Sequence, residues 1–410
     1  MVVRSMPRDV QWALRAAREY CSRPQWSHLV FGVTGWLLCS AAKLCRVAGA
    51  AKGGHRTSLA RFLSQAEWAA DMVLKAVTLE LVRWLRPRSG EGLLLLIDDT
   101  RIAKRAKRMA ALTKIWDHTS QRFVHGHIVV HAAIVFRGVT LPWSFELWLP
   151  EKYCRREQLA YRKVTSIAAE MIGTFTPPNG VKVRVLFDAF YLCASVTKAC
   201  ELRGFTWFSV ASKNRRISRE GRGQSGQLGD LAAGVLKHRS GHVRMKRDRG
   251  WRWLRIATID GRLKKIGRVR IVFSKRPGDA WKKVVAIVTN ETHLAAREIV
   301  SIYERRWAIE VLFKELKGSL GLGSYQMLAR SGVVRHLHLA ALAHLTLTRH
   351  SLTAAGAQAQ QPHKDVPLPK FQTRLVTLRA AIQRQQIERL IERTKPAKLR
   401  QRLRKLLLAT

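Results

Sequence analysis

The chain of 410 residues carries 74 lysines and arginines against 28 aspartates and glutamates, which gives a formal net charge of +46 at pH 7. Self-repulsion at this level opposes compaction, so a polyanionic partner is expected, and nucleic acid is the first candidate. Hydrophobic residues make up 47% of the chain. This content excludes a disordered tail protein, and the length leaves room for two or three domains.

An anionic membrane is the other polyanionic surface to consider. The longest uncharged, mostly apolar run covers residues 29–42, which is shorter than the roughly 20 residues that a membrane-spanning helix needs. No basic-then-apolar leader stands out near the start, and the six cysteines show no paired CxxC spacing. We therefore expect an unsecreted protein with reduced thiols, no membrane partner, and a cytoplasmic location with direct access to DNA.

Residues 1–88 are expected to form a helical N-terminal domain. Apolar residues recur at helical spacing in three segments, residues 10–21, 29–47 and 59–85. Basic side chains are spread along them, namely Arg4, Arg8, Arg15, Arg18, Lys43, Arg46, Lys52, Arg56 and Arg61. This pattern fits a DNA-end-binding module, and it fits equally a plain helical bundle with a solvated basic face.

From residue 89 the pattern changes to strands alternating with helices. Short apolar runs predict strands at residues 93–97, 127–136, 139–149, 181–187 and 205–211. Residues 158–172 and 191–202 predict helices between them. This alternation favours an α/β fold with a mixed sheet, and residues 89–220 are assigned to the first part of that core.

Residues 221–280 interrupt this alternation of strands and helices. Gly-rich turns and alternating stretches at 251–259 and 267–273 predict a β-rich insertion with a strongly basic face. A strand at 284–288 and a long helix at about 292–317 then return to the core, whose second part is assigned to residues 281–356. A polar linker and a basic amphipathic helical tail make up residues 357–410.

Acidic residues are scarce, and three acidic positions stand out by their place in the predicted elements. Asp98 and Asp99 end the apolar run LLLLI, Asp188 ends the strand VRVLF, and Glu310 lies within the long helix. Two strand ends that lie side by side would bring carboxylates together, and a packed helix would add a third. Such an oxygen site suits Mg²⁺ or Mn²⁺, and two ions about 4 Å apart catalyse phosphoryl displacement. Each aspartate alone could instead cap a turn or a helix, but capping does not explain all three acidic positions together in so basic a chain.

The helix around Glu310 carries the most specific pattern. Tyr303, Arg306, Glu310 and Lys317 lie at helical offsets that place all four within roughly 60° of one another, at about 100° per residue. One stripe thus presents a phenol, a guanidinium, a carboxylate and an ammonium. The plainer interpretation is an amphipathic helix with an ion pair between Glu310 and Lys314. That interpretation requires neither the tyrosine nor the strand-end aspartates.

The spacing Y-x2-R-x3-E-x6-K of these four residues resembles the YREK signature of the DDE transposases of bacterial insertion sequences. Asp99, which directly precedes Thr100, and the strand-end Asp188 resemble the first two acids of that class. The resemblance covers roughly residues 93–345. It implies an RNase H-like fold with a β-rich insertion before the glutamate.

The resemblance also implies roles for individual residues. Asp99, Asp188 and Glu310 would bind two Mg²⁺ or Mn²⁺ ions, although the sequence alone does not decide between Asp98 and Asp99. Tyr303, Arg306 and Lys317 would hold phosphates and the strand end near the cleavage point. Further DNA contacts are expected from residues outside the signature, namely Lys213, Arg215, Arg216, Trp281 and Trp307.

The function that the resemblance implies is cut-and-paste DNA transposition. The enzyme would hydrolyse phosphodiesters at the terminal inverted repeats of an insertion sequence and transfer the freed strands into target DNA. It would work as a homodimer assembled on DNA, in a bacterial cytoplasm and near the nucleoid. The alternatives are an RNase H-like nuclease without strand transfer and a non-catalytic, domesticated transposase that only binds DNA.

Overall fold

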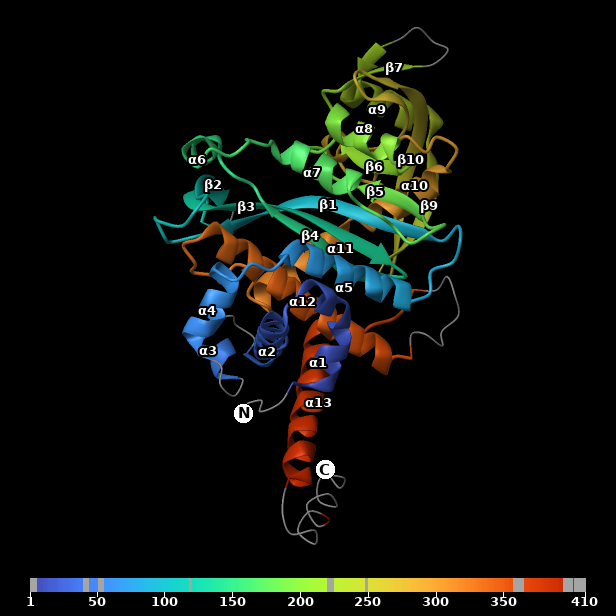
Figure 1. Cartoon of the computed structure of the whole chain (residues 1–410). Helices are drawn as coiled ribbons and strands as arrows, with labels where there is room; N and C mark the ends of the chain where they lie inside the picture. Colours follow the sequence, from blue (N-terminus) through green and yellow to red (C-terminus); the bar gives the residue numbers. More distant parts are fainter. Residues whose placement is uncertain are drawn as a thin grey trace.

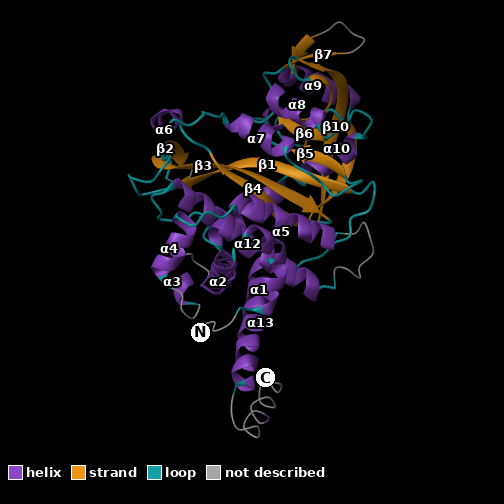
Figure 2. Ribbon diagram, viewed as in Figure 1, coloured by secondary structure: helices purple, strands orange, loops and turns teal. Residues whose placement is uncertain are grey.

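The computed structural model describes residues 6–39, 44–50, 55–117, 120–219, 225–247, 250–356, 365–393 and 401 (Figure 1). In this part of the chain a mixed sheet of twelve strands crosses the molecule, with helices packed on both of its faces (Figure 2). This arrangement confirms the predicted α/β class. Of the basic residues named above, Arg4, Lys43 and Lys52 lie outside the described residues.

Five strands form the part of the sheet that an RNase H-like fold requires. In spatial order they are β4 (Val139–Leu147), β3 (Arg122–Phe136), β1 (Gly92–Ala103), β5 (Lys182–Leu186) and β6 (Thr206–Ala211). β3 is antiparallel to both of its neighbours, β4 and β1, and β1, β5 and β6 run parallel. A short strand, β2 (Thr113–Asp117), pairs with the beginning of β3. The carboxyl ends of the three parallel strands consequently meet along one side of the sheet.

The predicted turn between β3 and β4 is confirmed. Arg137 and Gly138 both have positive φ angles, 47° and 74°, as a tight two-residue hairpin requires. The buried guanidinium of Arg137 donates to both carboxylate oxygens of Glu91, at 2.7 and 3.0 Å, and so ties this turn to the segment before β1.

The predicted β-rich insertion is an extension of the same sheet. Its strands are β7 (Arg216–Arg219), β8 (Ser225–Gln227), β9 (Gly241–Arg247), β10 (Gly250–Leu263) and β11 (Gly267–Lys275). A helix, α9 (Leu228–Arg239), lies between β8 and β9. The insertion joins the core through β12 (Val285–Thr289), which pairs with β6 on one side and with β11 on the other.

The three predicted N-terminal helical segments are each divided in two. The structure has α1 (Arg8–Ala13), the 3₁₀ turn η1 (Arg15–Tyr20), α2 (Arg23–Cys39), α3 (Leu44–Gly49), α4 (Arg56–Ser64) and α5 (Ala70–Trp84). Helices α2, α4 and α5 pack against α12 (Arg330–Ala354), which also contacts β4. The N-terminal helices therefore share one continuous hydrophobic core with the sheet.

The remaining helices include those that cover the sheet and α13 (Phe371–Glu392), which packs against α12 and α2. They are α6 (Glu151–Arg156), α7 (Val164–Gly173), α8 (Ala194–Leu202), η2 (Trp281–Lys283), α10 (Ala296–Glu304), α11 (Trp307–Gly318) and α13. Helices α7 and α8 cover one face, and α5, α11 and α12 cover the other (Figure 1). None of the helices in the described part of the chain is both long and apolar enough to cross a bilayer.

The prediction of one continuous helix over residues 292–317 was wrong. The chain forms α10 and α11 with a tight turn between them, in which Arg306 N donates to Tyr303 O and Ile309 N donates to Arg306 O. These bonds span three residues, as in a 3₁₀ helix, because both Arg305 and Arg306 keep helical backbone angles. The chain therefore keeps a helical course through Arg306, with a tighter turn there than in an α-helix.

Candidate active site

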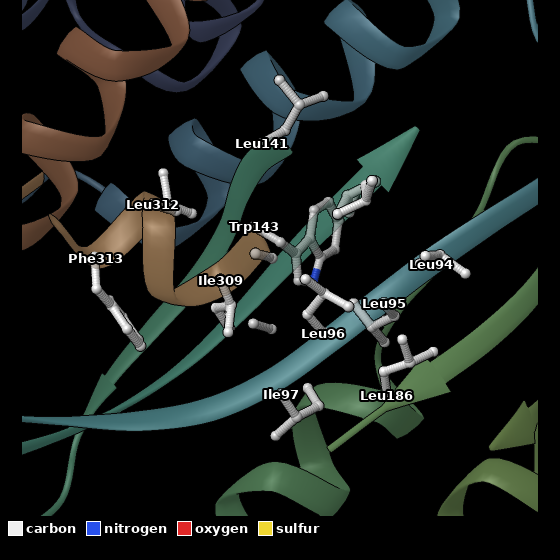
Figure 3. Close-up of a cluster of buried hydrophobic side chains, with 14 of the residues drawn as sticks. Leu94, Leu95, Leu96, Ile97, Leu141, Trp143, Leu186, Ile309, Leu312 and Phe313 are labelled. Carbon is white, nitrogen blue, oxygen red and sulfur yellow. The ribbon is translucent and has the colours of Figure 1, made fainter. Parts of the chain in front are cut away.

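The adjacent aspartates Asp98 and Asp99 lie on β1, where successive side chains point to opposite faces. Figure 3 shows this alternation just before them: Leu96 points towards Trp143 and Ile309, whereas Ile97 points to the other side of the strand. Asp98 therefore shares a face with Leu96 and with helix α11. Asp99 faces the side that α7 and α8 cover.

Arg306 joins two of the acidic side chains. Its guanidinium donates to Asp98 Oδ2 at 2.9 Å and to Glu310 Oε1 at 2.6 Å. All three side chains are largely shielded from solvent, with 17% of Arg306, 17% of Asp98 and 33% of Glu310 exposed. The tight turn at Arg306 thus places the first turn of α11 directly over β1.

Asp188 follows β5 and lies in a local turn. Its Oδ1 accepts hydrogen bonds from the backbone N–H of Phe190 at 2.9 Å and of Tyr191 at 3.4 Å. The following helix, α8, begins at Ala194, so Asp188 shapes the turn without capping that helix. The hydroxyl of the buried Tyr191 donates to Asp99 Oδ1 at 3.1 Å. Tyr191 therefore links the Asp188 turn to β1.

The electrostatics of this cluster disfavour negative charge. Burial raises the pKa of Asp98 to about 6; the nearby charges of Asp188 and Asp99 add to the rise, and Arg306 opposes it. Burial also raises the pKa of Asp99, and the hydrogen bond from Tyr191 opposes that rise. A cation bound beside Asp98 and Asp99 would lower the electrostatic cost of their negative charges.

The donor set of the cluster fits a divalent metal ion. Carboxylate oxygens are the ligands that Mg²⁺ and Mn²⁺ prefer in proteins. Within the described residues, however, no three side chains of His, Cys, Asp or Glu come close enough together to hold one ion. Glu310 is engaged by Arg306 instead. The chemistry of these carboxylates therefore suits a divalent metal ion.

The other predicted site residues fall into two groups. Tyr303 lies beside the cluster, where burial raises its pKa to about 12 and Arg306 opposes the rise. Lys317 Nζ donates to Arg101 O at 3.0 Å, further along β1. Trp307 is 63% exposed at the start of α11. Trp307 and Lys317 lie on α11 with Glu310, whereas Tyr303 lies near the end of α10.

The predicted DNA contacts Lys213 and Arg215 lie beyond β6. Arg215 donates to the backbone oxygen of Leu192, which places it next to the turn that contains Asp188. Lys213 donates to the backbone oxygen of Lys282 and so lies beside η2. Arg215 therefore borders the turn that contains Asp188, and Lys213 contacts the segment before β12.

Two features of the site were missed from the sequence. Tyr191 was taken only as the beginning of a helix, although its place three residues after Asp188 is the signal that could have identified it. The ion pair between Asp98 and Arg306 joins residues 208 positions apart, and no local pattern predicts such a pair.

Comparisons with known families agree with this geometry. A family model described as DDE superfamily endonuclease matches residues 21–230, just over half of the chain. A second, described as transposase DDE domain, matches residues 159–346. The first match includes Asp98, Asp99 and Asp188, and the second includes Asp188 and Glu310. A search of curated proteins found no match. The chain therefore belongs to the DDE superfamily of endonucleases and carries a transposase DDE domain.

Proposed function

We propose that this protein is a DNA transposase that hydrolyses phosphodiesters at the ends of an insertion sequence and joins the freed 3′ ends to target DNA. The observation that carries the proposal is the acidic cluster on β1, in the turn after β5 and on α11, in a chain with a net charge of +46. A strongly basic chain attracts the phosphate backbone of DNA, and the few acidic side chains that lie together are available for catalysis.

Asp99, Asp188 and Glu310 are proposed to hold two divalent ions, Mg²⁺ or Mn²⁺. When bound, the ions would activate the attacking water or 3′ hydroxyl and stabilise the leaving oxygen. Tyr303 at the end of α10, Arg306 in the turn and Lys317 on α11 are proposed to hold phosphate oxygens. Arginine suits this task because its planar fork of donors matches the geometry of a phosphate.

A second arrangement of the first ligand is favoured by one observation. Asp98, not Asp99, lies on the face of β1 that α11 covers, and Arg306 bridges Asp98 to Glu310. In that arrangement Asp98 would exchange Arg306 for a metal ion. Asp99 would instead hold Tyr191 in place.

The test is a cleavage assay with Mg²⁺ and DNA that carries the ends of the element. We expect Asp188→Asn, Glu310→Gln and Asp99→Asn to abolish cleavage while DNA binding survives, because each change removes a ligand charge and leaves the shape intact. Glu151→Gln is the matched control, since Glu151 lies in an exposed ion pair. Cleavage at the wild-type rate by the Asp188 or Glu310 variant contradicts the proposal. Loss of cleavage in Asp98→Asn but not in Asp99→Asn assigns the first ligand to Asp98.

Product analysis separates transposition from simpler activities. Joined products that contain element and target DNA support strand transfer, whereas nicks without joined products indicate a nuclease. DNA that shifts in a gel but is never cut indicates a non-catalytic binding protein. A homodimer on paired DNA ends is also proposed, and the mass of the protein–DNA complex in light scattering measures it.

A further inference from the structure

The hairpin of β9 and β10 projects from the sheet as a two-stranded ribbon. In β10, residues 255–263 pair with β11 and residues 250–256 pair with β9, so residues 250–254 pair with β9 but not with β11. The beginning of β10 thus extends past the end of β11 at Lys275. The family matches give no role to the side chains of this ribbon.

One face of the ribbon carries two exposed tryptophans beside positive charge. Trp251 and Trp253 are each 53% exposed, while Leu254 and Ile256 of the same strand are buried. Trp253 is paired across the ribbon with Arg244, whose guanidinium lies over the ring of Trp251 at 4.4 Å from its centroid. Two indoles exposed on one side of a strand are unusual, because tryptophan is mostly buried in folded proteins.

The strand directions place this ribbon at the side of the sheet that holds the acidic cluster. β6 is antiparallel to β12, β12 to β11, and β11 to β10. The beginning of β10 therefore lies on the side of the sheet towards which β1, β5 and β6 run. Asp98 and Asp99 lie on β1, and Asp188 directly follows β5.

We propose that the Trp251–Trp253 face of the β9–β10 ribbon binds unpaired DNA by stacking bases on the two indoles. An indole has a flat face for stacking and a single N–H donor, so this surface cannot read the edges of a duplex in detail. In a duplex the faces of the bases are already stacked on each other, whereas in a single strand they are available. Arg244 covers one face of Trp251, adds positive charge next to the backbone, and leaves the exposed side of the ring for a base.

The test measures binding without cleavage. Fluorescence anisotropy of the full chain, in EDTA, compares a labelled oligothymidine of about 15 nucleotides with a duplex of the same length. We expect the double change Trp251→Ala and Trp253→Ala to weaken binding of the single strand about tenfold or more, and to change duplex binding by less than about twofold. The double change to Phe keeps an aromatic face and should retain most of the single-strand affinity.

Tyr161→Ala is the matched control, because Tyr161 is an aromatic residue with 43% exposure far from β10 in the sequence. Thermal unfolding of each variant establishes that it is folded. An unchanged single-strand affinity in the Ala pair, or an equal loss for duplex and single strand, overturns the proposal. Because the assay contains no divalent metal, its outcome is independent of the proposed cleavage activity.

Discussion

Arg306 is the residue on which the geometry of the acidic cluster depends. Its guanidinium donates to Asp98 and Glu310 at once, and its backbone forms the tight turn between α10 and α11. A largely buried arginine is stable only when its charge is paired. A lysine could not replace it, because one ammonium does not present two donors in a fixed plane.

Tyr191→Phe tests whether the hydroxyl that donates to Asp99 positions that carboxylate. The phenyl ring still fills the buried space, so we expect the fold to be unchanged. A hydrogen bond to a charged group contributes about 1.5–3 kcal/mol, so a roughly tenfold or greater loss in kcat is expected if the bond holds Asp99 in its active position. KM for DNA should stay constant. Steady-state cleavage kinetics measure both constants.

The control for this change is Tyr153→Phe, which removes a hydroxyl from α6, on a part of the chain that lacks the acidic cluster. A fall in kcat of the same size in both variants, or a rise in KM alone for Tyr191→Phe, would contradict the positioning role.

At the scale of elements, strands were predicted better than helices. The strand at 93–97 and the hairpin around Arg137-Gly138 were confirmed, because a doubly buried strand and a tight turn leave local signatures in the sequence. The strand nevertheless continues to Ala103, so Asp98 and Asp99 lie within it and not at its end. The helix boundaries were wrong where a short turn interrupts the chain without changing its apolar spacing, as at Arg305 and Arg306. Helical periodicity does not detect such a turn, because it averages over a window longer than the turn.

Two glycines of α2 give a matched pair of stability predictions. A Cβ on Gly35 would lie 2.3 Å from Val47 O, a backbone atom of α3 that cannot move aside on its own, whereas a Cβ on Gly32 meets only side-chain atoms at 3.5 Å or more. We expect Gly35→Ala to lower the free energy of unfolding by about 1–3 kcal/mol through overpacking. Gly32→Ala should be neutral or raise it by up to about 1 kcal/mol, because alanine favours a helix.

Urea denaturation of both variants measures the difference. Equal free energies of unfolding for the two variants would show that α2 and α3 do not approach each other closely at Gly35.

At the scale of the whole molecule, the sequence indicated candidate residues for the site but not which of them contact one another. The positions of Asp188 and Glu310 followed from a strand end and a helical stripe. The contact of Arg306 with Asp98, and the opposite faces taken by Asp98 and Asp99, follow from how β1 packs under α11. Packing between elements far apart in the chain leaves no pattern in one sequence.

Buried histidines make the stability of the whole fold depend on pH. Burial lowers the pKa of His131 and His336 to about 3 from an ordinary value of 6.5. Each ring uses one nitrogen in a hydrogen bond to a backbone oxygen, and within the described residues His131 Nε2 and His336 Nδ1 have no partner. Below pH 6.5 these histidines therefore bind protons in the unfolded chain, whereas in the folded chain they bind protons only near pH 3.

The free energy of unfolding should consequently be highest above pH 6.5 and fall as the pH drops towards 3. Each histidine contributes up to about 1.4 kcal/mol per pH unit in this window. Denaturation at several pH values measures the slope. His131→Asn and His336→Gln keep the donor to the backbone oxygen and remove the titrating ring, so each should flatten the slope. An unchanged slope in both variants would contradict this origin.

The burial of α12 has a consequence for how the protein is made. The N-terminal helices end at Trp84, and the helix against which they pack begins at Arg330, almost 250 residues later. At about 5–20 residues per second, ribosomes need tens of seconds to bridge that interval. Throughout it, the apolar faces of α2, α4 and α5 lack their native cover. We therefore expect the nascent chain to bind chaperones until α12 has been synthesised and can cover these faces.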